Sequence, residues 1–433
     1  MMARLISLVI SRQIDQVFLL GACISLVAIG LMLPLSVTGT DIAVVVAASL
    51  SLLSGIVFRS GKEILHNPLT IPIIIFVVLV TLGMFWSIAP WTQRLSALHK
   101  YSKLLYIPLL LPLCKGRWRD YAINAFLLSM MMTVILSLLK AYTVLKFGKV
   151  AAPSWVFHNH IETSYFVAFS AYLVIDRALQ SSRSWYWRAF YGVLAVLFTY
   201  QEFFINDGRT GWLVYFCLIL LFVIQRLRPD PLSATPQSLR LRFKNITLGM
   251  FLGTISVFLI GLLPYEFSNV FRANADETLY AIKHQISFTH LVGIHPLPQA
   301  TGEGFKSVEP RINFLGFSLS LIKQHPIMGL GSGSFKTAYQ QAGGIPGSYK
   351  HLDTPHNEYL LVMVQLGVLG FAALLWIFYT QASMTPYLGE FRRPAQALLV
   401  SYLVGCVFNA FLFTMVAGYF YVLFSSVFFA EKY

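Results

Sequence analysis

The stretch TPHNEYLLVMVQLGVLGFAALLWIFYT, residues 354–380, joins a polar start to a long apolar run. A helix needs about 20 apolar residues to cross a bilayer, and this run is long enough. A membrane helix does not need polar residues at its start, yet three follow Pro355 in succession: His356, Asn357 and Glu358. The stretch therefore predicts a membrane-spanning helix whose first residues have a function other than crossing the membrane.

The composition of the whole chain excludes a soluble globular protein. Of its 433 residues, 57% are hydrophobic and 12% are charged, whereas soluble domains carry about 25% charged residues. We predict an all-α, polytopic membrane protein with about 12 transmembrane helices, because each apolar run is close to the length that a bilayer requires. The predicted spans are 17–36, 42–58, 70–88, 95–114, 121–143, 162–180, 188–206, 210–226, 246–264, 357–380, 396–413 and 414–430.

The basic residues indicate how the chain is oriented. Lys and Arg outnumber Asp and Glu by 32 to 18, and most of them sit in short loops on one side of the spans, as in cytoplasmic loops. Both termini are therefore predicted to be cytoplasmic, with membrane lipids and anionic substrates as partners rather than nucleic acid. The chain then forms one integrated membrane domain, with helices 1–9 over 1–264, a large outer loop over 265–356 and helices 10–12 over 357–433.

The outer loop is too long to be a passive connector. Its segment RINFLGFSLSLIKQH, residues 311–325, has apolar residues at 312, 315, 319 and 322. This spacing predicts an amphipathic helix that lies on the membrane surface or over the bundle. The glycine-rich GLGSGSF, residues 329–335, lacks the lysine and the strand of a phosphate loop, so we interpret it as a turn.

Two arginines on the predicted outer side are candidates for function. Arg209, in NDGRTGW, begins the eighth span, and Arg311 begins the amphipathic helix. Charges near a span are costly and usually functional, and a guanidinium at a helix start favours a bound anion. The alternatives are that Arg209 snorkels or pairs with Asp207, and that Arg311 pairs with Glu309.

His356 is the third candidate on the outer side. With Thr354 or Asp353 as the N-cap and Pro355 at the first helical position, His356 falls in the first turn. The helix dipole there disfavours imidazolium, which leaves the ring neutral and able to accept a proton. The alternative is a histidine that caps the helix or lies among lipid headgroups. Asn357 and Glu358 either orient His356, contact a sugar or complete the cap.

Other polar residues lie near the outer ends of spans. Arg94 and Lys103 line the outer half of the fourth span, where they could face a cavity for phosphate. His158 and His160 form a His-x-His pair, but no third metal ligand is evident, so a hydrogen bond from His160 to substrate is the better interpretation. The four cysteines show no metal or disulfide spacing, and we predict neither a metal nor a cofactor.

Two guanidinium groups and a neutral base are what a transfer from a phosphate leaving group requires. The arginines would stabilise the departing pyrophosphate, and the base would take a proton from the attacking hydroxyl. A transporter or flippase for lipid-linked sugars is the alternative from another class. Transporters usually bind their substrate near the bilayer midplane between repeated halves, whereas these polar groups lie at outer ends and no repeat is visible.

HNEYLLVMVQLGVLG, residues 356–370, resembles the His-[Asn/Ser/Gln]-x9-Gly-x-x-Gly motif of the bacterial O-antigen ligases. The segment 311–335 and GRTGW, residues 208–212, are similar to further parts of the same superfamily, which includes O-antigen polymerases and protein O-oligosaccharyltransferases. The resemblance implies a GT-C-like glycosyltransferase in the inner membrane of a Gram-negative bacterium, with a periplasmic active site. We interpret Gly367 and Gly370 as a small-residue face for a neighbouring span.

The resemblance also implies an activity. A ligase moves O-antigen from undecaprenyl pyrophosphate to a sugar hydroxyl of lipid A-core, with inversion and without a metal. His356 would be the base, and Arg209 and Arg311 the pyrophosphate contacts. Substrate contacts by Arg94, Lys103, His160 and Asn357 are our own inference from position. A polymerase or a protein O-oligosaccharyltransferase would use the same donor and differ only in its acceptor.

Overall fold

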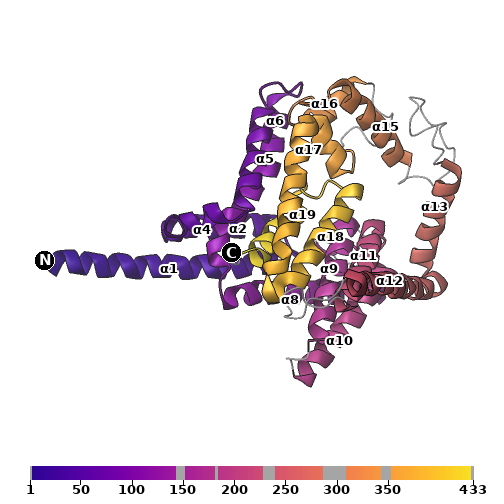
Figure 1. Cartoon of the computed structure of the whole chain (residues 1–433), viewed down its shortest axis with the longest axis horizontal. Coiled ribbons are helices and arrows are strands. Elements are labelled where there is room, and N and C mark those ends of the chain that lie inside the picture. The colour runs from indigo at the N-terminus through magenta and orange to yellow at the C-terminus, as the bar shows by residue number, and fades with distance from the viewer. Residues whose placement is uncertain are drawn as a thin grey trace.

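The computed structural model describes residues 2–142, 152–180, 184–227, 239–285, 309–342 and 353–430. For 2–12, 239–246, 280–285 and 309–313 it describes the backbone alone. All regular structure in these ranges is helical, as predicted (Figure 1). The main helices are α1 Met2–Met32, α2 Val37–Leu53, α3 Ile56–Arg59, α4 Gly61–His66, α5 Thr70–Leu82, α6 Trp91–Ser102, α7 Tyr106–Leu110, α8 Arg117–Tyr142, α9 His160–Ala178, α10 Trp185–Tyr200, α11 Arg209–Leu227, α12 Leu239–Phe267, α13 Asn269–Gln285, α15 Glu309–Gln324, α16 Ser334–Gln341, α17 Glu358–Met384, α18 Arg392–Phe408 and α19 Met415–Phe428.

Each predicted span contains a helix, but the helices differ in length. Five stretches in the described ranges are long and apolar enough to cross a membrane: Gln13–Met32, Arg117–Tyr142, Arg209–Leu227, Thr247–Phe267 and Glu358–Tyr387. The predicted fourth span is not one α-helix, since 3-10 turns at Lys103–Leu105 and Leu111–Leu113 interrupt it. Pro108 and Pro112 lie in this part, and proline removes a backbone donor that a continuous helix needs.

Helices α17, α18 and α19 lie at the centre of the molecule, while α1 and α12 extend to opposite sides (Figure 1). All residues of α19 from Val416 to Phe428 are buried, as expected of a helix that is apolar all round. Phe420 stacks on Phe166 of α9 at 4.9 Å between ring centroids and meets Tyr165 edge-on. Each such ring pair adds about 0.5–1.5 kcal/mol beyond its buried area, so the core of the bundle is aromatic.

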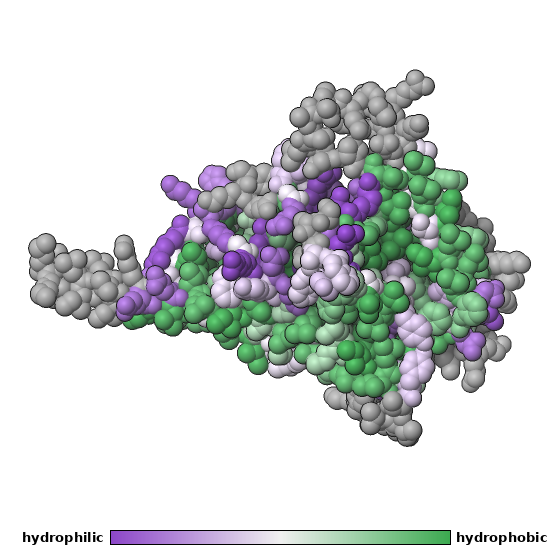
Figure 2. Space-filling model, turned by 90° about the horizontal axis from the view of Figure 1, so that it is seen from below, coloured by the Kyte–Doolittle hydropathy of each residue, from purple (hydrophilic) through white to green (hydrophobic). Residues whose placement is uncertain are grey.

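The surface around this core is largely apolar. Figure 2 shows a broad hydrophobic area with hydrophilic side chains gathered toward its upper left. Helix α12 exposes Phe251, Phe258 and Leu263, each more than half accessible. Exposed apolar areas of this extent mark membrane contact, which agrees with the membrane protein predicted from composition.

Helix α17 is broken at Gly367, where the backbone turns to φ 63° and ψ −158°. The segment that follows α15 fills the break: Leu330 N–H donates to Val364 O at 2.8 Å, and Val368 N–H donates to Pro326 O at 2.9 Å. The prediction that Gly367 packs against a neighbouring span is therefore wrong, because Gly367 contacts the segment that follows α15. The turn predicted at 329–335 is present and is part of this contact.

We expect Gly367→Ala to destabilise the protein strongly. A Cβ on Gly367 would lie 2.2 Å from Ile327 O, and this region of φ and ψ is essentially restricted to glycine at a cost of about 1–3 kcal/mol for other residues. The thermal unfolding midpoint in detergent should fall by several degrees. Gly192→Ala on α10 is the matched control, because its Cβ would meet nothing within 4 Å; equal midpoints for the two variants would contradict the expectation.

The amphipathic helix predicted from residue 311 is present as α15, with Arg311 as its third residue. Of the predicted stripe at 312, 315, 319 and 322, Ile322 packs partly buried against the core, and the side chain at 312 lies outside the described part. Phe314 and Ser318 are fully buried, and the rings of Phe314 and Phe317 pack on Tyr339 of α16 at 5.3 and 5.4 Å. The helix buries the face that meets α16 and α17 because aromatic residues are concentrated there. The Arg311 side chain lies outside the described part.

Candidate active site

Several helices begin around one short loop, residues Asn409–Thr414, which we call the 409–414 loop. Thr414 precedes the first residue of α19. Asn409 donates from Nδ2 to Thr210 Oγ1 at the start of α11, at 2.9 Å. The backbone N–H groups of Leu412 and Phe413 donate to Glu358 Oε2 at the start of α17, at 2.8 and 3.1 Å. Helix starts carry a positive dipole end, and the Glu358 side chain already accepts from the backbone N–H groups of this loop.

The start of α9 joins the same region through α11. Ser164 Oγ donates to Gly208 O at 2.9 Å, and a Cβ on Gly208 would lie 2.7 Å from His160 O. His160 and Arg209 therefore lie on directly contacting backbone segments. The structure brings the beginnings of α9, α11, α17 and α19 together from four separate parts of the chain.

His356 lies just before α17 rather than in its first turn. The N-cap is Asn357, whose Oδ1 accepts from Leu360 N–H at 2.9 Å. The predicted caps at Thr354 or Asp353 and the first helical position at Pro355 are therefore wrong. Asparagine is among the best N-cap residues, and it also donates to Val407 O at 2.8 Å. The prediction that the helix dipole keeps His356 neutral assumed a place in the first turn, and His356 does not lie there.

The backbone of His356 has a φ of 54°. Among the described residues, His356 is the non-glycine residue whose φ is positive. Non-glycine residues are uncommon there, and such strain is concentrated at functional sites. The imidazole centroid lies 6.2 Å from the Phe314 ring of α15. Upstream, Lys100 Nζ pairs with Asp353 Oδ2 at 2.5 Å. The strained conformation is thus held between α6, α15 and the cap of α17.

Glu358 has a structural task. Its side chain is fully buried, and besides the two backbone groups of the 409–414 loop it accepts from Tyr101 OH at 2.8 Å. Of the roles left open for Glu358, anchoring the start of α17 is the one that these contacts support. The carboxylate fixes the position from which Asn357 and His356 project.

Arg209 begins α11, as predicted, but its partners lie on α13. Its guanidinium donates to Asn274 Oδ1 at 3.0 and 3.1 Å and to Thr278 Oγ1 at 3.2 Å, and it forms a salt bridge with Glu277. The alternative pairing with Asp207 is not observed; Asp207 accepts from Ser154 instead. An anionic substrate would therefore compete with Glu277 for this guanidinium.

Arg94 and Lys103 are engaged with backbone carbonyls. Arg94 donates to Ala89 O at 2.6 Å and to Met84 O at 2.8 Å, which holds the turn between α5 and α6. Lys103 is 1% exposed and donates to Thr414 O in the 409–414 loop. Both side chains stabilise the frame of the site through these hydrogen bonds.

The two histidines before α9 have separate surroundings. His160 is the first residue of α9, behind the Asn159 cap, and its ring stacks on Trp155 with centroids 5.3 Å apart. His158 Nε2–H donates to Leu33 O at 2.9 Å, and burial lowers the pKa of His158. Within the described residues, no group of three or more His, Cys, Asp and Glu side chains could hold a metal ion.

Residues 194–375 match the family model of the O-antigen ligases. This part of the chain belongs to the O-antigen ligase family. The resemblance seen in the sequence is thereby confirmed, and the matched region contains Arg209, Arg311 and His356. Members of the family are glycosyltransferase-like enzymes, O-antigen ligases and polymerases. The comparison with curated proteins returned no match.

The family region also contains a buried carboxylate that the sequence analysis missed. Glu202 is fully buried; its Oε1 lies 2.5 Å from Ser164 Oγ, and its Oε2 accepts from Asn206 Nδ2 at 3.0 Å. It lies in a π-helical turn, Gln201–Ile205, a distortion common at functional sites. A glutamate within the predicted seventh span was the available signal. Glu202 ties α9 to the segment that presents Arg209.

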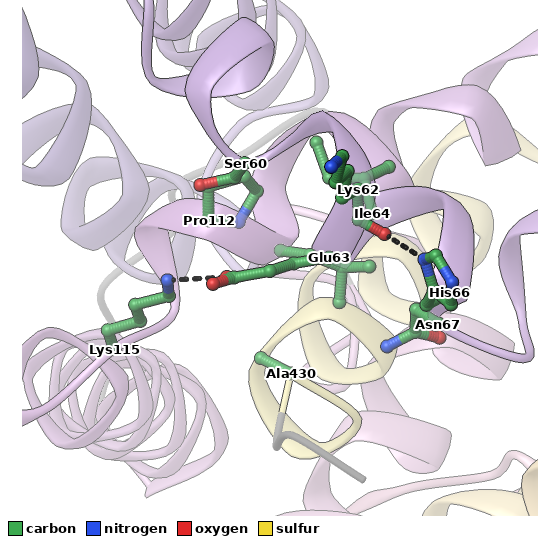
Figure 3. Close-up of a pocket in the computed structure, with 10 residues that line it drawn as sticks. Ser60, Lys62, Glu63, Ile64, His66, Asn67, Pro112, Lys115 and Ala430 are labelled. Atoms are coloured by element: carbon green, nitrogen blue, oxygen red, sulfur yellow. Dashed lines mark hydrogen bonds and ion pairs between the residues drawn. The ribbon is translucent and has the colours of Figure 1, made fainter.

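A surface cleft lies away from the starts of α9, α11 and α17. It has a volume of about 320 Å³ and is lined by residues of α4 together with Lys115 and Ala430 (Figure 3). Its Lys115–Glu63 pair, at 2.9 Å, is about half exposed, and exposed pairs of this kind contribute only about 0–1 kcal/mol. None of the predicted site residues lines this cleft.

Proposed function

We propose that this O-antigen ligase family protein is a ligase that transfers O-antigen from undecaprenyl pyrophosphate to a sugar hydroxyl of lipid A-core. The reaction takes place at the periplasmic face of the inner membrane, without a metal and with inversion. The observation that carries the proposal is the strained His356 before α17, linked through the 409–414 loop to the helix that begins with Arg209.

In this mechanism His356 accepts the proton of the acceptor hydroxyl as its oxygen bonds to the anomeric carbon of the donor. The bond from that carbon to the pyrophosphate oxygen breaks, and undecaprenyl pyrophosphate leaves with the electron pair. Arg209 and Arg311 stabilise the charge that develops on the leaving group. The converging helix starts add their positive dipole ends.

The remaining candidates support this chemistry in two ways. His160, beside the backbone of Gly208, is proposed to hydrogen-bond the substrate. Arg94, Lys103 and Asn357, proposed substrate contacts from their position, are supported by their hydrogen bonds mainly as residues that position the site. A lipid-linked-glycan polymerase is the second candidate, because the matched family includes polymerases.

The test is reconstitution of the purified protein in proteoliposomes with lipid-linked O-antigen and lipid A-core. We expect Arg209→Ala to slow transfer by about 10²–10³-fold, the usual effect of losing one group that stabilises developing charge. Arg59→Ala is the control, since Arg59 forms an Arg–Asp pair with Asp15 on the predicted cytoplasmic side. A chelator should leave the rate unchanged.

Three results would contradict the proposal. Longer lipid-linked glycan without modified lipid A-core would indicate a polymerase. Movement of the donor across the bilayer without transfer would indicate a flippase. Loss of activity with chelator would exclude the metal-independent mechanism.

A further inference from the structure

A continuous chain of hydrogen bonds runs through the π-helical turn Gln201–Ile205 from one backbone carbonyl to another. It starts at Pro153 O and ends at Gly208 O, directly before Arg209. Five fully buried side chains connect the two ends: Ser137, Gln201, Asn206, Glu202 and Ser164. Because a carbonyl oxygen can only accept, the two ends determine the direction of every hydrogen bond between them.

The direction at the first end follows from Ser137. Its Oγ lies 2.7 Å from Pro153 O, so the hydroxyl donates its one proton there. Ser137 therefore accepts from Gln201 Nε2 at 2.8 Å, and the second N–H of that amide donates to Asn206 Oδ1 at 3.1 Å. The Asn206 amide consequently turns its Nδ2 toward Glu202 Oε2, which accepts at 3.0 Å.

The direction at the other end follows from Ser164. Its hydroxyl donates to Gly208 O at 2.9 Å, and the same oxygen lies 2.5 Å from Glu202 Oε1. The hydroxyl has no second proton for Glu202. An ionised carboxylate would therefore place an acceptor against an acceptor, whereas a protonated carboxyl group donates at a distance that is normal for O–H···O.

The surroundings of Glu202 also favour the neutral form. Among the residues that the structure describes, no salt bridge joins Glu202 to a cation. Arg209, the basic residue closest to it in sequence, pairs with Glu277 instead. A buried carboxylate without a counter-ion is strongly disfavoured, while a neutral carboxyl group needs only the two hydrogen-bond partners that it has here.

The carboxyl group and Ser164 lie directly against the first turn of α11. A Cβ on Gly211 would lie 1.9 Å from Ser164 Oγ and 2.6 Å from Glu202 Oε1, so no side chain fits between them and the helix. Trp212 Nε1 donates to the backbone O of Glu202 at 2.7 Å. These contacts hold the chain on both sides of Arg209 and thereby fix the point from which its guanidinium projects.

We infer that Glu202 is a neutral carboxylic acid that donates its proton to Ser164 Oγ, and that this bond positions Arg209 at the candidate active site. The protonation of Glu202 is independent of the proposed function, whereas the effect on transfer rests on it. Glu202 acts through α11 and is a positioning residue, since neither it nor Ser164 touches the substrate in this scheme.

The first test is the infrared difference spectrum between the purified wild-type protein and Glu202→Gln at neutral pH. We expect the carbonyl stretch of a protonated carboxyl group in the wild type. Ser164→Ala should shift this band, because the acid loses its acceptor. The two stretches of an ionised carboxylate in its place would overturn the inference.

The second test is the initial rate of glycan transfer in proteoliposomes. Glu202→Gln should transfer nearly as fast as the wild type, because its amide can donate to Ser164 and accept from Asn206 as the neutral acid does. Glu202→Leu and Ser164→Ala should each slow transfer by up to about 10²-fold, since a misplacement of about 1 Å can have that effect. Ser170→Ala is the matched control, because Ser170 is also buried on α9 and its Oγ has no hydrogen-bond partner.

A Glu202→Gln variant as slow as Glu202→Leu would show that the charge is needed and would overturn the inference. Ser164→Ala at the rate of Ser170→Ala would overturn the positioning of Arg209. If Glu202→Leu does not fold, the comparison of Ser164→Ala with Ser170→Ala decides the same point. If the wild type transfers no glycan, the proposed function fails, while the infrared band still decides the protonation of Glu202.

Discussion

His356→Asn is expected to abolish glycan transfer while leaving the fold intact. A general base contributes about 10²–10⁴ to a rate, and the asparagine side chain cannot take its place. Asparagine is enriched in the left-handed conformation that His356 adopts at φ 54°, so the backbone should keep its path. The expected result is a loss of transfer of at least about 100-fold with an unfolding midpoint at or above that of the wild type.

The measurement is the initial rate in the reconstituted system, together with the unfolding midpoint in detergent. His99→Asn is the matched control, because His99 is an exposed histidine on the neighbouring α6 and should keep full transfer. Full activity of His356→Asn would show that His356 is not the base. A large drop in its midpoint would show that the histidine is structural.

Of the substitutions considered, Glu358→Ala is expected to cause the largest loss of stability. The substitution leaves Tyr101 OH and two backbone N–H groups of the 409–414 loop without their acceptor, at about 1–3 kcal/mol for each buried group. The total exceeds about 3 kcal/mol, which corresponds to a midpoint lowered by on the order of 5 °C or more. Transfer should fall with it, because the start of α17 and the loop lose their connection.

Glu266→Ala supplies the comparison. Glu266 is 65% exposed and lies 3.6 Å from Arg272, so its loss should cost no more than about 1 kcal/mol. If Glu358→Ala and Glu266→Ala unfold at the same temperature, the buried contacts of Glu358 do not stabilise the protein. If Glu358→Ala is less stable but transfers normally once reconstituted, the carboxylate does not position the site.

The sequence predicted the class of structure well, because the apolar runs and their lengths follow from the bilayer alone. All twelve predicted spans contain helices, and the start of α11 at Arg209 was predicted correctly. The rules for helix capping predicted less where several residues could serve as the N-cap. Thr354, Asp353 and Asn357 are all able to cap a helix. Asn357 is the N-cap of α17, where its side chain also donates to Val407 O.

The sequence by itself predicted an all-α membrane protein and a region that resembles the O-antigen ligases, since hydrophobic run length and a spaced motif are properties of the chain alone. Only the tertiary structure decided the break at Gly367, the burial of Glu358 and the pairing of Arg209 with α13. The 409–414 loop joins residues about 200 positions apart, as in the bond from Asn409 to Thr210. Contacts of that kind leave no periodicity in the sequence, because they depend on where the helices pack.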